Sequence, residues 1–425
     1  MSTISQRATP TRWWMLLILS VGFIALSLNW FDIASAFPAL GQQFHLQIPQ
    51  LALLIALFFA GYGIFHIPSG LLASRFGVRN VLLAGLLIEA LGAIASAFAP
   101  GYGWLGLLRV LTGIGGSLFV GCGFSLVTSW FRGRELALAM GIATGGGFTL
   151  GIVLGLFVWV GFVQAAGWSI ALATGGGIGL LAFLISLVFL RAPSEEQERL
   201  AAGHLNWAAV GRVLGNRDLW LLGLSFLGLY GAGLTLAQLL NTYVPIVYHV
   251  PETTSGLMAA LFTLSAIPGS ILGGFLFDRT KRAKLVILVP WLLSGLALII
   301  FPLVNLAGAW LLMVVLGGLP FVGFSGWAAA PGRYKDRILP EDVATAGGLL
   351  LTLAGVGGFL MPIIFGMIAT SSGFPSAWIA LGVISIVFAL IGFVAREPLS
   401  ASAPPESLAA SVSTVTAAQS ADTSL

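Results

Sequence analysis

The chain has little charge and almost no cysteine. Of its 425 residues only 8% are charged, whereas soluble domains carry about 25%. A protein so poor in charge cannot cover its surface against water, which excludes an ordinary soluble globular protein. The single cysteine, Cys122, excludes an internal disulfide and any cysteine cluster for metal, and its small apolar neighbours indicate an inert, packed thiol.

Catalytic and nucleotide-binding patterns are also missing. The sequence contains no nucleophile–base motif, no H-E-x-x-H zinc spacing and no phosphate-binding loop. The GGG triplets at 145–147 and 175–177 lie inside apolar runs rather than after a strand. We therefore expect no enzyme activity, no cofactor and no metal ion. Because no soluble domain of useful size is apparent, any active transport would have to draw on an ion gradient.

Apolar residues, in contrast, dominate the chain. They make up 58% of it, and the mean hydropathy is +1.01. A bilayer core of about 30 Å needs about 20 mostly apolar residues per helix. Twelve such runs are present, at 13–38, 50–73, 80–99, 103–130, 136–163, 168–190, 218–246, 254–277, 284–304, 308–331, 343–370 and 375–395. They predict an all-α membrane protein with twelve transmembrane helices in the lipid bilayer.

The basic residues are placed on one side of these runs. Of the 19 lysines and arginines, all but Arg109 fall in the N-terminal segment, the even-to-odd loops, the central linker or the start of the tail. This distribution predicts a multi-pass protein of the cytoplasmic membrane with both termini in the cytoplasm. Because the basic residues are scattered singly, the net charge of +4 reflects orientation in a membrane and not nucleic-acid binding.

The chain divides into two related halves. The polar segment 191–217 divides the spans into six plus six, and we interpret it as a cytoplasmic linker between two six-helix bundles, 13–190 and 218–395. An N-terminal cytoplasmic segment (1–12) precedes the first bundle, and a disordered cytoplasmic tail (396–425) follows the second. The turn PSGLLASRFGVRN at 68–80 is repeated as GGFLFDRTKRAK at 273–284. In this alignment Gly70 matches Gly274, Ser74 matches Asp278 and Arg75 matches Arg279. A parallel repeat of this kind is typical of two-bundle transporters.

With these motifs the sequence resembles the major facilitator superfamily over residues 13–395. The loop signature of that family is G-x-x-x-D-R-x-G-R-K/R, and the first copy keeps Gly70, Arg75, Gly77 and Arg79 but has Ser74 in place of the aspartate. LLRVLTGIGGS around Arg109 and the glycine stripe GIATGGGFTLGIVLG are also similar to family motifs. The resemblance implies two pseudo-symmetric bundles that alternate access, with these loops latching the bundles in the outward-facing state. We expect Ser74 to weaken the first latch, and Asp278 with Arg279 to retain more of the gating role.

Two branches of the family are similar in single spans. NWFDIASAFPAL is similar to the first span of the organic anion:cation symporters, with Ile33 where those carry an arginine. The glycines of spans 5 and 11 are similar to those of nitrate/nitrite carriers, which have an arginine where this chain has His66. Neither substrate can be carried over to this chain.

Three charged residues lie within the predicted spans and away from their ends: Asp32, Glu89 and Arg109. A charge at the bilayer centre costs at least about 2.5–3.5 kcal/mol, so each needs a reason. In the functional interpretation, Arg109 attracts an anionic group or pairs with Asp32, whose protonation is coupled to transport. In the structural interpretation, Arg109 forms an intramembrane ion pair with Glu89 or Asp32 that only holds the first bundle together.

Polar residues extend this candidate site. Asn29 lies three residues before Asp32 and shares its helix face. His66 can serve as a proton or anion site, or can bond a carbonyl freed by Pro68. In the second half, Tyr230, Gln238 and Asn241 can contact substrate or form interhelical hydrogen bonds. Trp327 is a candidate cavity aromatic or a packing residue.

The sequence predicts a monomeric secondary transporter that moves a small-molecule substrate by alternating access. The favoured mode is proton-coupled uptake of a small anionic metabolite. Drug or metabolite efflux is the alternative, weakened because span 5 lacks the proline that marks drug antiporters. A channel and a non-transporting receptor are further alternatives, and the two-fold repeat argues against the channel.

Overall fold

The computed structural model describes residues 10–131, 135–191, 207–280, 282–334, 338–339 and 342–397. The expected N-terminal segment up to residue 9, most of the expected linker (192–206) and the expected tail from residue 398 lie outside the described residues. The domain boundaries that we placed at the linker stay a prediction.

The described ranges contain helices and no strand. The elements are α1 (Pro10–Phe44), α2 (Ile48–Phe76), α3 (Val78–Ser96), α4 (Tyr102–Trp130), α5 (Leu136–Met140), η1 (Gly141–Phe148), α6 (Thr149–Val153), η2 (Leu154–Val158), α7 (Trp159–Ala166), α8 (Trp168–Phe189), α10 (Trp207–Leu214), α11 (Arg217–Tyr248), α12 (Glu252–Arg279), α13 (Ala283–Ile300), η3 (Phe301–Leu303), α14 (Leu306–Ala329), η4 (Ala330–Arg333), α15 (Val343–Ile391) and η6 (Gly392–Val394).

Eleven helical stretches of the described chain are long and apolar enough to cross a membrane. The last, α15, contains two of the twelve predicted spans, because Gly373 has φ 83° and ψ 167° and breaks the helix there. Glycine adopts this conformation without a steric penalty, so a sharp bend forms within the short segment 371–374 that separates the two predicted spans. The twelve-helix prediction is thus confirmed, with observed ends within a few residues of the predicted ones.

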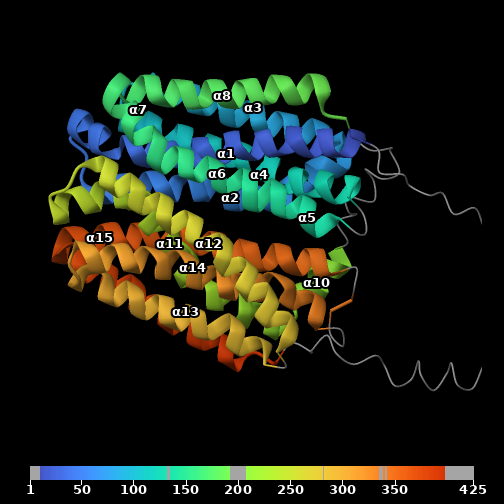
Figure 1. Cartoon of the computed structure of the whole chain (residues 1–425). Helices are drawn as coiled ribbons and strands as arrows, with labels where there is room; N and C mark the ends of the chain where they lie inside the picture. Colours follow the sequence, from blue (N-terminus) through green and yellow to red (C-terminus); the bar gives the residue numbers. More distant parts are fainter. Residues whose placement is uncertain are drawn as a thin grey trace, which may run out of the picture.

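The helices form two groups. Figure 1 shows α1 to α8 lying together along one side of the molecule and α11 to α15 along the other. Within the first group, α4 packs against α2 and α3, and α8 packs against α1 and α3; within the second, α11 packs against α15 and α12 against α14. Glycines permit this close packing. A Cβ on Gly61 or Gly113, for example, would collide with the backbone of the neighbouring helix.

The fifth span is not the uniform helix that its apolar run predicted. Two π-helical segments, η1 and η2, interrupt it, with α6 between them. π-helical turns shift backbone pairing by one residue and often lie at functional positions. This span therefore has an irregular backbone where it faces both α1 and the second group of helices.

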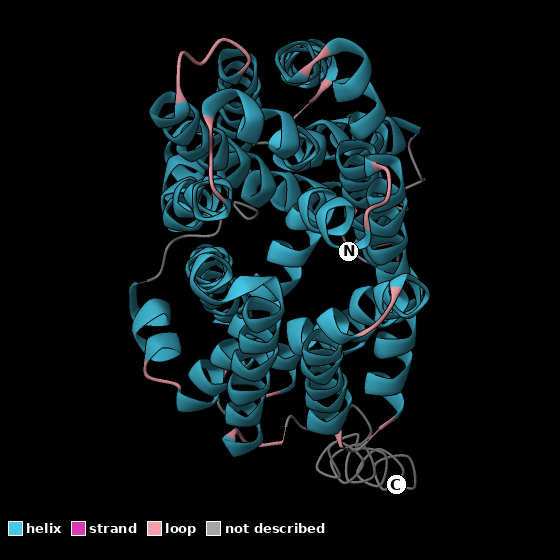
Figure 2. Ribbon diagram, turned by 90° about the vertical axis from the view of Figure 1, so that its left-hand side faces the viewer, coloured by secondary structure: helices cyan, strands magenta, loops and turns pink. Residues whose placement is uncertain are grey.

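The two groups meet unequally at their two ends. We call the end with Arg12, Glu135, Arg212 and Arg396 the terminal face, and the end with Gln164 and Glu252 the opposite face; Figure 2 looks onto the opposite face. Toward the opposite face, Gly256 packs on Leu156 and Phe157, and Gly366 packs on Pro49.

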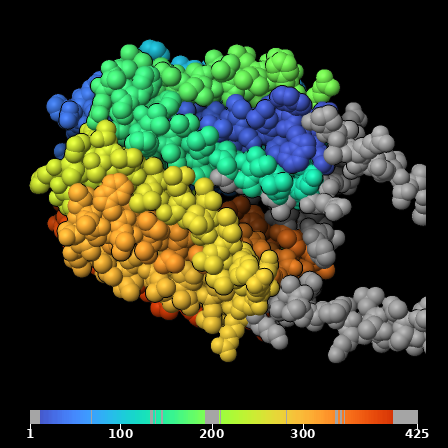
Figure 3. Space-filling view, viewed as in Figure 1, coloured from blue at the N-terminus to red at the C-terminus, as the bar shows by residue number. Residues whose placement is uncertain are grey.

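Toward the terminal face the same helices separate. Positions Gly70 of α2 and Gly347 and Gly348 of α15 have open space, with no atom within 4 Å of a Cβ built there. Figure 3 shows a recess between the groups at this end, between α5 and α12. The boundary between the halves is therefore closed at the opposite face and open at the terminal face.

Candidate functional site

Four polar side chains from three helices meet inside the first group. They are Asn29 and Asp32 of α1, Glu89 of α3 and Arg109 of α4, and each is at most 3% exposed. A fourth helix, α8, packs against both α1 and α3 and closes the site from outside. We call these four residues the buried polar cluster. All four were candidates from the sequence.

Arg109 is held by the backbone of α1. Its guanidinium donates to the carbonyl oxygens of Asn29 (3.3 Å) and Trp30 (3.0 Å), and Cζ lies 4.8 Å from the centroid of the Phe58 ring. Neither Glu89 nor Asp32 forms an ion pair with Arg109 among the described residues, so the expected direct pair is not made in this conformation. The three charged groups remain within one buried cluster and still act on one another electrostatically.

The cluster contains polar atoms without hydrogen-bond partners. They are both side-chain heteroatoms of Asn29, Oδ2 of Asp32, both carboxylate oxygens of Glu89 and Nε of Arg109. Two glycines of α8 make the room that these groups occupy. A Cβ on Gly175 would lie 2.6 Å from Oδ2 of Asp32 and 2.9 Å from Oδ1 of Asn29, and one on Gly179 would lie 2.8 Å from Nδ2 of Asn29.

The buried polar cluster lies within the first group of helices. Asp32 and Asn29 face α8, on the side of α1 turned away from the second group of helices. Arg109 lies behind the Phe58 ring. The reason is the helical period: positions 29 and 32 share one face of α1, and the large aromatic Trp30 takes the face toward α2. The cluster is thus internal to one half.

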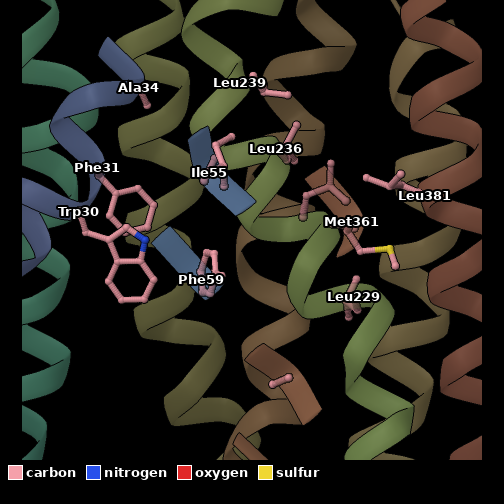
Figure 4. Close-up of a cluster of buried hydrophobic side chains, with 14 of the residues drawn as sticks. Trp30, Phe31, Ala34, Ile55, Phe59, Leu229, Leu236, Leu239, Met361 and Leu381 are labelled. Atoms are coloured by element: carbon pink, nitrogen blue, oxygen red, sulfur yellow. The ribbon is translucent and has the colours of Figure 1, made fainter. Parts of the chain in front are cut away.

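The residues at the boundary itself are mainly aromatic. Trp30 lies 4.7 Å from Phe58, 5.3 Å from Phe59 and 5.0 Å from Tyr62, measured between ring centroids. Figure 4 shows Trp30 and Phe59 beside the apolar side chains of α11 and α15. From the second group, Tyr230 lies 6.3 Å from Phe59, measured between ring centroids. Nε1 of Trp30 is buried without a hydrogen-bond partner.

His66 belongs to this boundary region. Its Nδ1 lies 2.9 Å from Oγ of Ser117 on α4, and its ring lies 4.4 Å from that of Tyr62. The hydrogen bond to Ser117 occupies one ring nitrogen, so His66 does not simply bond a carbonyl freed by Pro68. We call Trp30, Tyr62, His66, Ser117 and Tyr230 the boundary cluster.

The other candidates of the second half have separate roles. Trp327 donates from Nε1 to the carbonyl oxygen of Leu222 (2.8 Å) and is 1% exposed, packed against Phe226 and Trp291. These contacts favour the packing interpretation for Trp327. Gln238 is fully buried, and neither atom of its amide has a hydrogen-bond partner.

Asn241 crosses the boundary between the halves. Its Nδ2 donates to Oγ of Ser35 on α1 (3.2 Å) and to the carbonyl oxygen of Leu156 in η2 (2.9 Å). Ser35 in turn donates to the carbonyl oxygen of Gly155 (2.6 Å). The π-helical segment supplies both carbonyl acceptors, so the interhelical interpretation of Asn241 describes this conformation.

The loop residues of the first half bond within that half. Ser74 donates to a carbonyl three residues earlier in α2, and Arg75 lies over the neighbouring phenylalanine ring. Gly77, with φ 86°, forms the turn between α2 and α3. Arg79 donates to two carbonyl oxygens at the C-terminal end of α8 (2.7 and 2.6 Å), and Gly70 faces open space.

The matching loop of the second half is organised differently. Asp278 pairs with Arg333 of η4 (2.6 Å) rather than with Arg279, whose Cζ lies 3.9 Å from a phenylalanine ring of α12. Gly274 faces open space. Nearby on the terminal face, Arg212 of α10 makes two 2.7 Å hydrogen bonds to Asp342, which hold the pKa of that carboxyl below its ordinary value.

The comparisons with known proteins agree with this architecture. The sequence pattern of the Major Facilitator Superfamily matches residues 18–335 and 239–420. The chain belongs to the Major Facilitator Superfamily. The predicted resemblance and the predicted two-bundle fold are thereby confirmed.

Individual superfamily members resemble the chain over most of its length. A probable L-galactonate transporter of Escherichia coli (strain K12) is 25% identical, covering 93% of this chain and 92% of that protein. The hexuronate transporter of the same strain is 24% identical, covering 89% and 93%. A bacterial homologue of the human lysosomal transporter Spinster superposes with a TM-score of 0.77 at 19% identity, covering 92% of this chain and 98% of that one.

Several residues of the site were not found from the sequence. Trp30, Tyr62, Ser117 and Ser35 carry no charge and look like ordinary span residues. The position of Trp30 could have indicated its role. Tryptophans of membrane proteins usually lie at the membrane–water interface, whereas Trp30 is two residues from the membrane-buried Asp32. Ser35 and Ser117 had none, because their roles depend on which helices meet.

Proposed function

We propose that this protein takes up a small anionic solute across the cytoplasmic membrane by alternating access, coupled to protons and acting as a monomer. The observation that carries the proposal is the burial of two carboxylates and an arginine among membrane-spanning helices. Such groups are costly in a bilayer and mark ion or proton pathways. The relatives support the substrate class, since galactonate and hexuronates are both carboxylates.

The orientation follows from the basic residues. Arg12, Arg212 and Arg396 lie on the terminal face, and the positive-inside rule supports a cytoplasmic position for this face. The open recess then faces the cytoplasm, and the closed opposite face is the outer gate. A carrier in this conformation would be releasing substrate inward.

The boundary cluster is the proposed substrate site. Tyr62, His66 and Ser117 of the first half and Tyr230 of the second bring hydrogen-bond donors to one region of the boundary. Hydroxyl and imidazole donors suit carboxylate oxygens. The surrounding aromatic rings would pack against the carbon skeleton of the solute.

Asp32 is the proposed proton-coupling residue. While it is ionised, its charge offsets that of Arg109. Protonation of Asp32 would leave the Arg109 charge uncompensated, and an anion at the boundary, beyond the Phe58 and Trp30 rings, would then be favoured. Proton and anion would therefore enter together.

The test is uptake of radiolabelled galactonate and galacturonate into proteoliposomes with an imposed pH gradient. We expect saturable uptake that an inward proton gradient accelerates and that Asp32→Asn makes insensitive to the gradient. Gly177→Ala, at an open position of α8, serves as the control variant. If Asp32→Asn still responds to the gradient, the coupling assignment is wrong. Accumulation of solute in the vesicles that is driven by an outward proton gradient would instead support proton-driven efflux.

A further inference from the structure

The buried polar cluster has an uneven charge count. With Asp32, Glu89 and Arg109 all ionised, the site would hold two negative charges and one positive charge at 3% exposure or less. An uncompensated charge among membrane-spanning helices is strongly disfavoured. No group on the helix that closes the site can supply the missing charge, because Trp168–Phe189 contains no titratable residue. One positive charge must therefore be bound, and a proton is the smallest that fits.

The hydrogen-bonding groups lead to the same count. The atoms without partners comprise four acceptors, which are Oδ1 of Asn29, Oδ2 of Asp32 and both oxygens of Glu89. Only two are donors: Nδ2 of Asn29 and Nε of Arg109. A proton on one carboxylate turns one acceptor into a donor, so that the cluster then has three acceptors and three donors. Buried polar groups are normally paired, so the protonated form is the one this geometry suits.

The two carboxylates are not equivalent hosts for that proton. Both oxygens of Glu89 lack a donor, whereas Asp32 has only one oxygen in that state. Arg109 donates to two carbonyl oxygens of α1, the helix that carries Asp32. The helices packed against α3 bring no other charge to Glu89: α1 contributes Asp32, α4 contributes Arg109, α8 contributes none, and His66 of α2 bonds Ser117. The proton is thus better placed on Glu89.

We infer that Glu89 is a resident neutral carboxylic acid, which donates a hydrogen bond to Asp32 or Asn29 and leaves Asp32 as the group that exchanges the transported proton. Acceptors for this hydrogen bond are present. Asn29 is 1% exposed, and its unpaired Oδ1 and the Oδ2 of Asp32 both lie next to Gly175. In this role Glu89 is a positioning residue that sets the proton affinity of Asp32. The inference rests on the proposed function for the role of Asp32.

The experiment combines infrared spectroscopy with transport on the full chain in liposomes. We expect a protonated-carboxyl band at neutral pH in the wild-type protein that disappears in Glu89→Gln, where Asp32 still balances the charge of Arg109. An amide keeps a donor, so Glu89→Gln should preserve the midpoint of the pH profile of uptake. Glu89→Ala leaves its neighbours unpaired and should shift that midpoint and slow uptake by about tenfold, a loss that the glutamine variant rescues.

Either of two results would overturn the inference. One is the absence of a pH-independent carboxyl band from the wild-type protein. The other is loss of the gradient response in Glu89→Gln, as for Asp32→Asn, which would make Glu89 an exchanging group. The spectroscopic measurement needs no substrate and can be made on wild type and Glu89→Gln alone. It therefore stands even if no anion is transported, a result that would count against the proposed function only.

Discussion

Replacing Asn241 by leucine removes the two hydrogen bonds that join α11 to Ser35 and to the carbonyl of Leu156 in η2. Each buried hydrogen bond contributes about 0.5–1.5 kcal/mol net, so the pair stabilises the closed outer boundary by about 1–3 kcal/mol. In a state open at the opposite face, water would replace these partners. We therefore expect Asn241→Leu to shift the equilibrium toward that state by about 5- to 150-fold.

Distances between spin labels can measure this shift. One pair, at Ala165 and Thr253, reports on the opposite face, and a second pair, at Arg75 and Arg279, reports on the terminal face; all four positions are exposed. In Asn241→Leu the first distance should lengthen and the second should shorten in the same fraction of molecules.

Thr242→Val is a matched control on the same helix turn. Thr242 is also buried, but its Oγ1 has no hydrogen-bond partner, so removing the hydroxyl breaks no link between the halves. Its distance distributions should match those of the parent. The reasoning fails if Asn241→Leu leaves both distributions unchanged, or if Thr242→Val shifts them equally.

Two further predictions concern the polar cluster and the terminal face. Gly175→Ala should lower the melting temperature and abolish gradient-driven uptake, because the added methyl group would lie within 2.9 Å of two polar atoms of the cluster. Gly177→Ala is the control: its methyl group would enter open space, so this variant should melt at the same temperature as wild type. Asp342→Asn should lower the melting temperature at pH 7. Because Arg212 lowers the pKa of Asp342, the ionised pair stabilises the fold above the ordinary pKa of 3.8, and this difference should shrink as pH falls below that value.

The sequence predicted the spans well because the bilayer imposes one strong rule on each of them. Length and hydropathy located all twelve, including the pair joined at Gly373, and charge alone singled out Asp32, Glu89 and Arg109. Local irregularity was not predicted. The π-helical turns of span 5 depend on its packing against α1 and α12, and its glycine-rich sequence reads equally well as a plain helix.

The direction in which a side chain points was harder to predict than its depth. Asp32 faces α8, because the glycines of α8 leave space there and the Trp30 ring fills the other side. The charge of Asp32 marked its position in the span but not this direction. For Asn241 the sequence left substrate contact and interhelical hydrogen bonding open. Its actual partners come from α1 and η2, which no local pattern could reveal.

α1 is the element through which the polar cluster and the boundary can communicate. One face carries Asn29 and Asp32 toward α8, and other positions carry Trp30 and Ser35 toward the boundary. Arg109 binds the backbone of this helix between the two sets, at the carbonyls of Asn29 and Trp30. A change in charge at Asp32 alters the force on Arg109, and Arg109 is bonded to the turn that positions Trp30. The proposed coupling between proton and solute would then require only a small movement of α1, without a proton entering the proposed solute site.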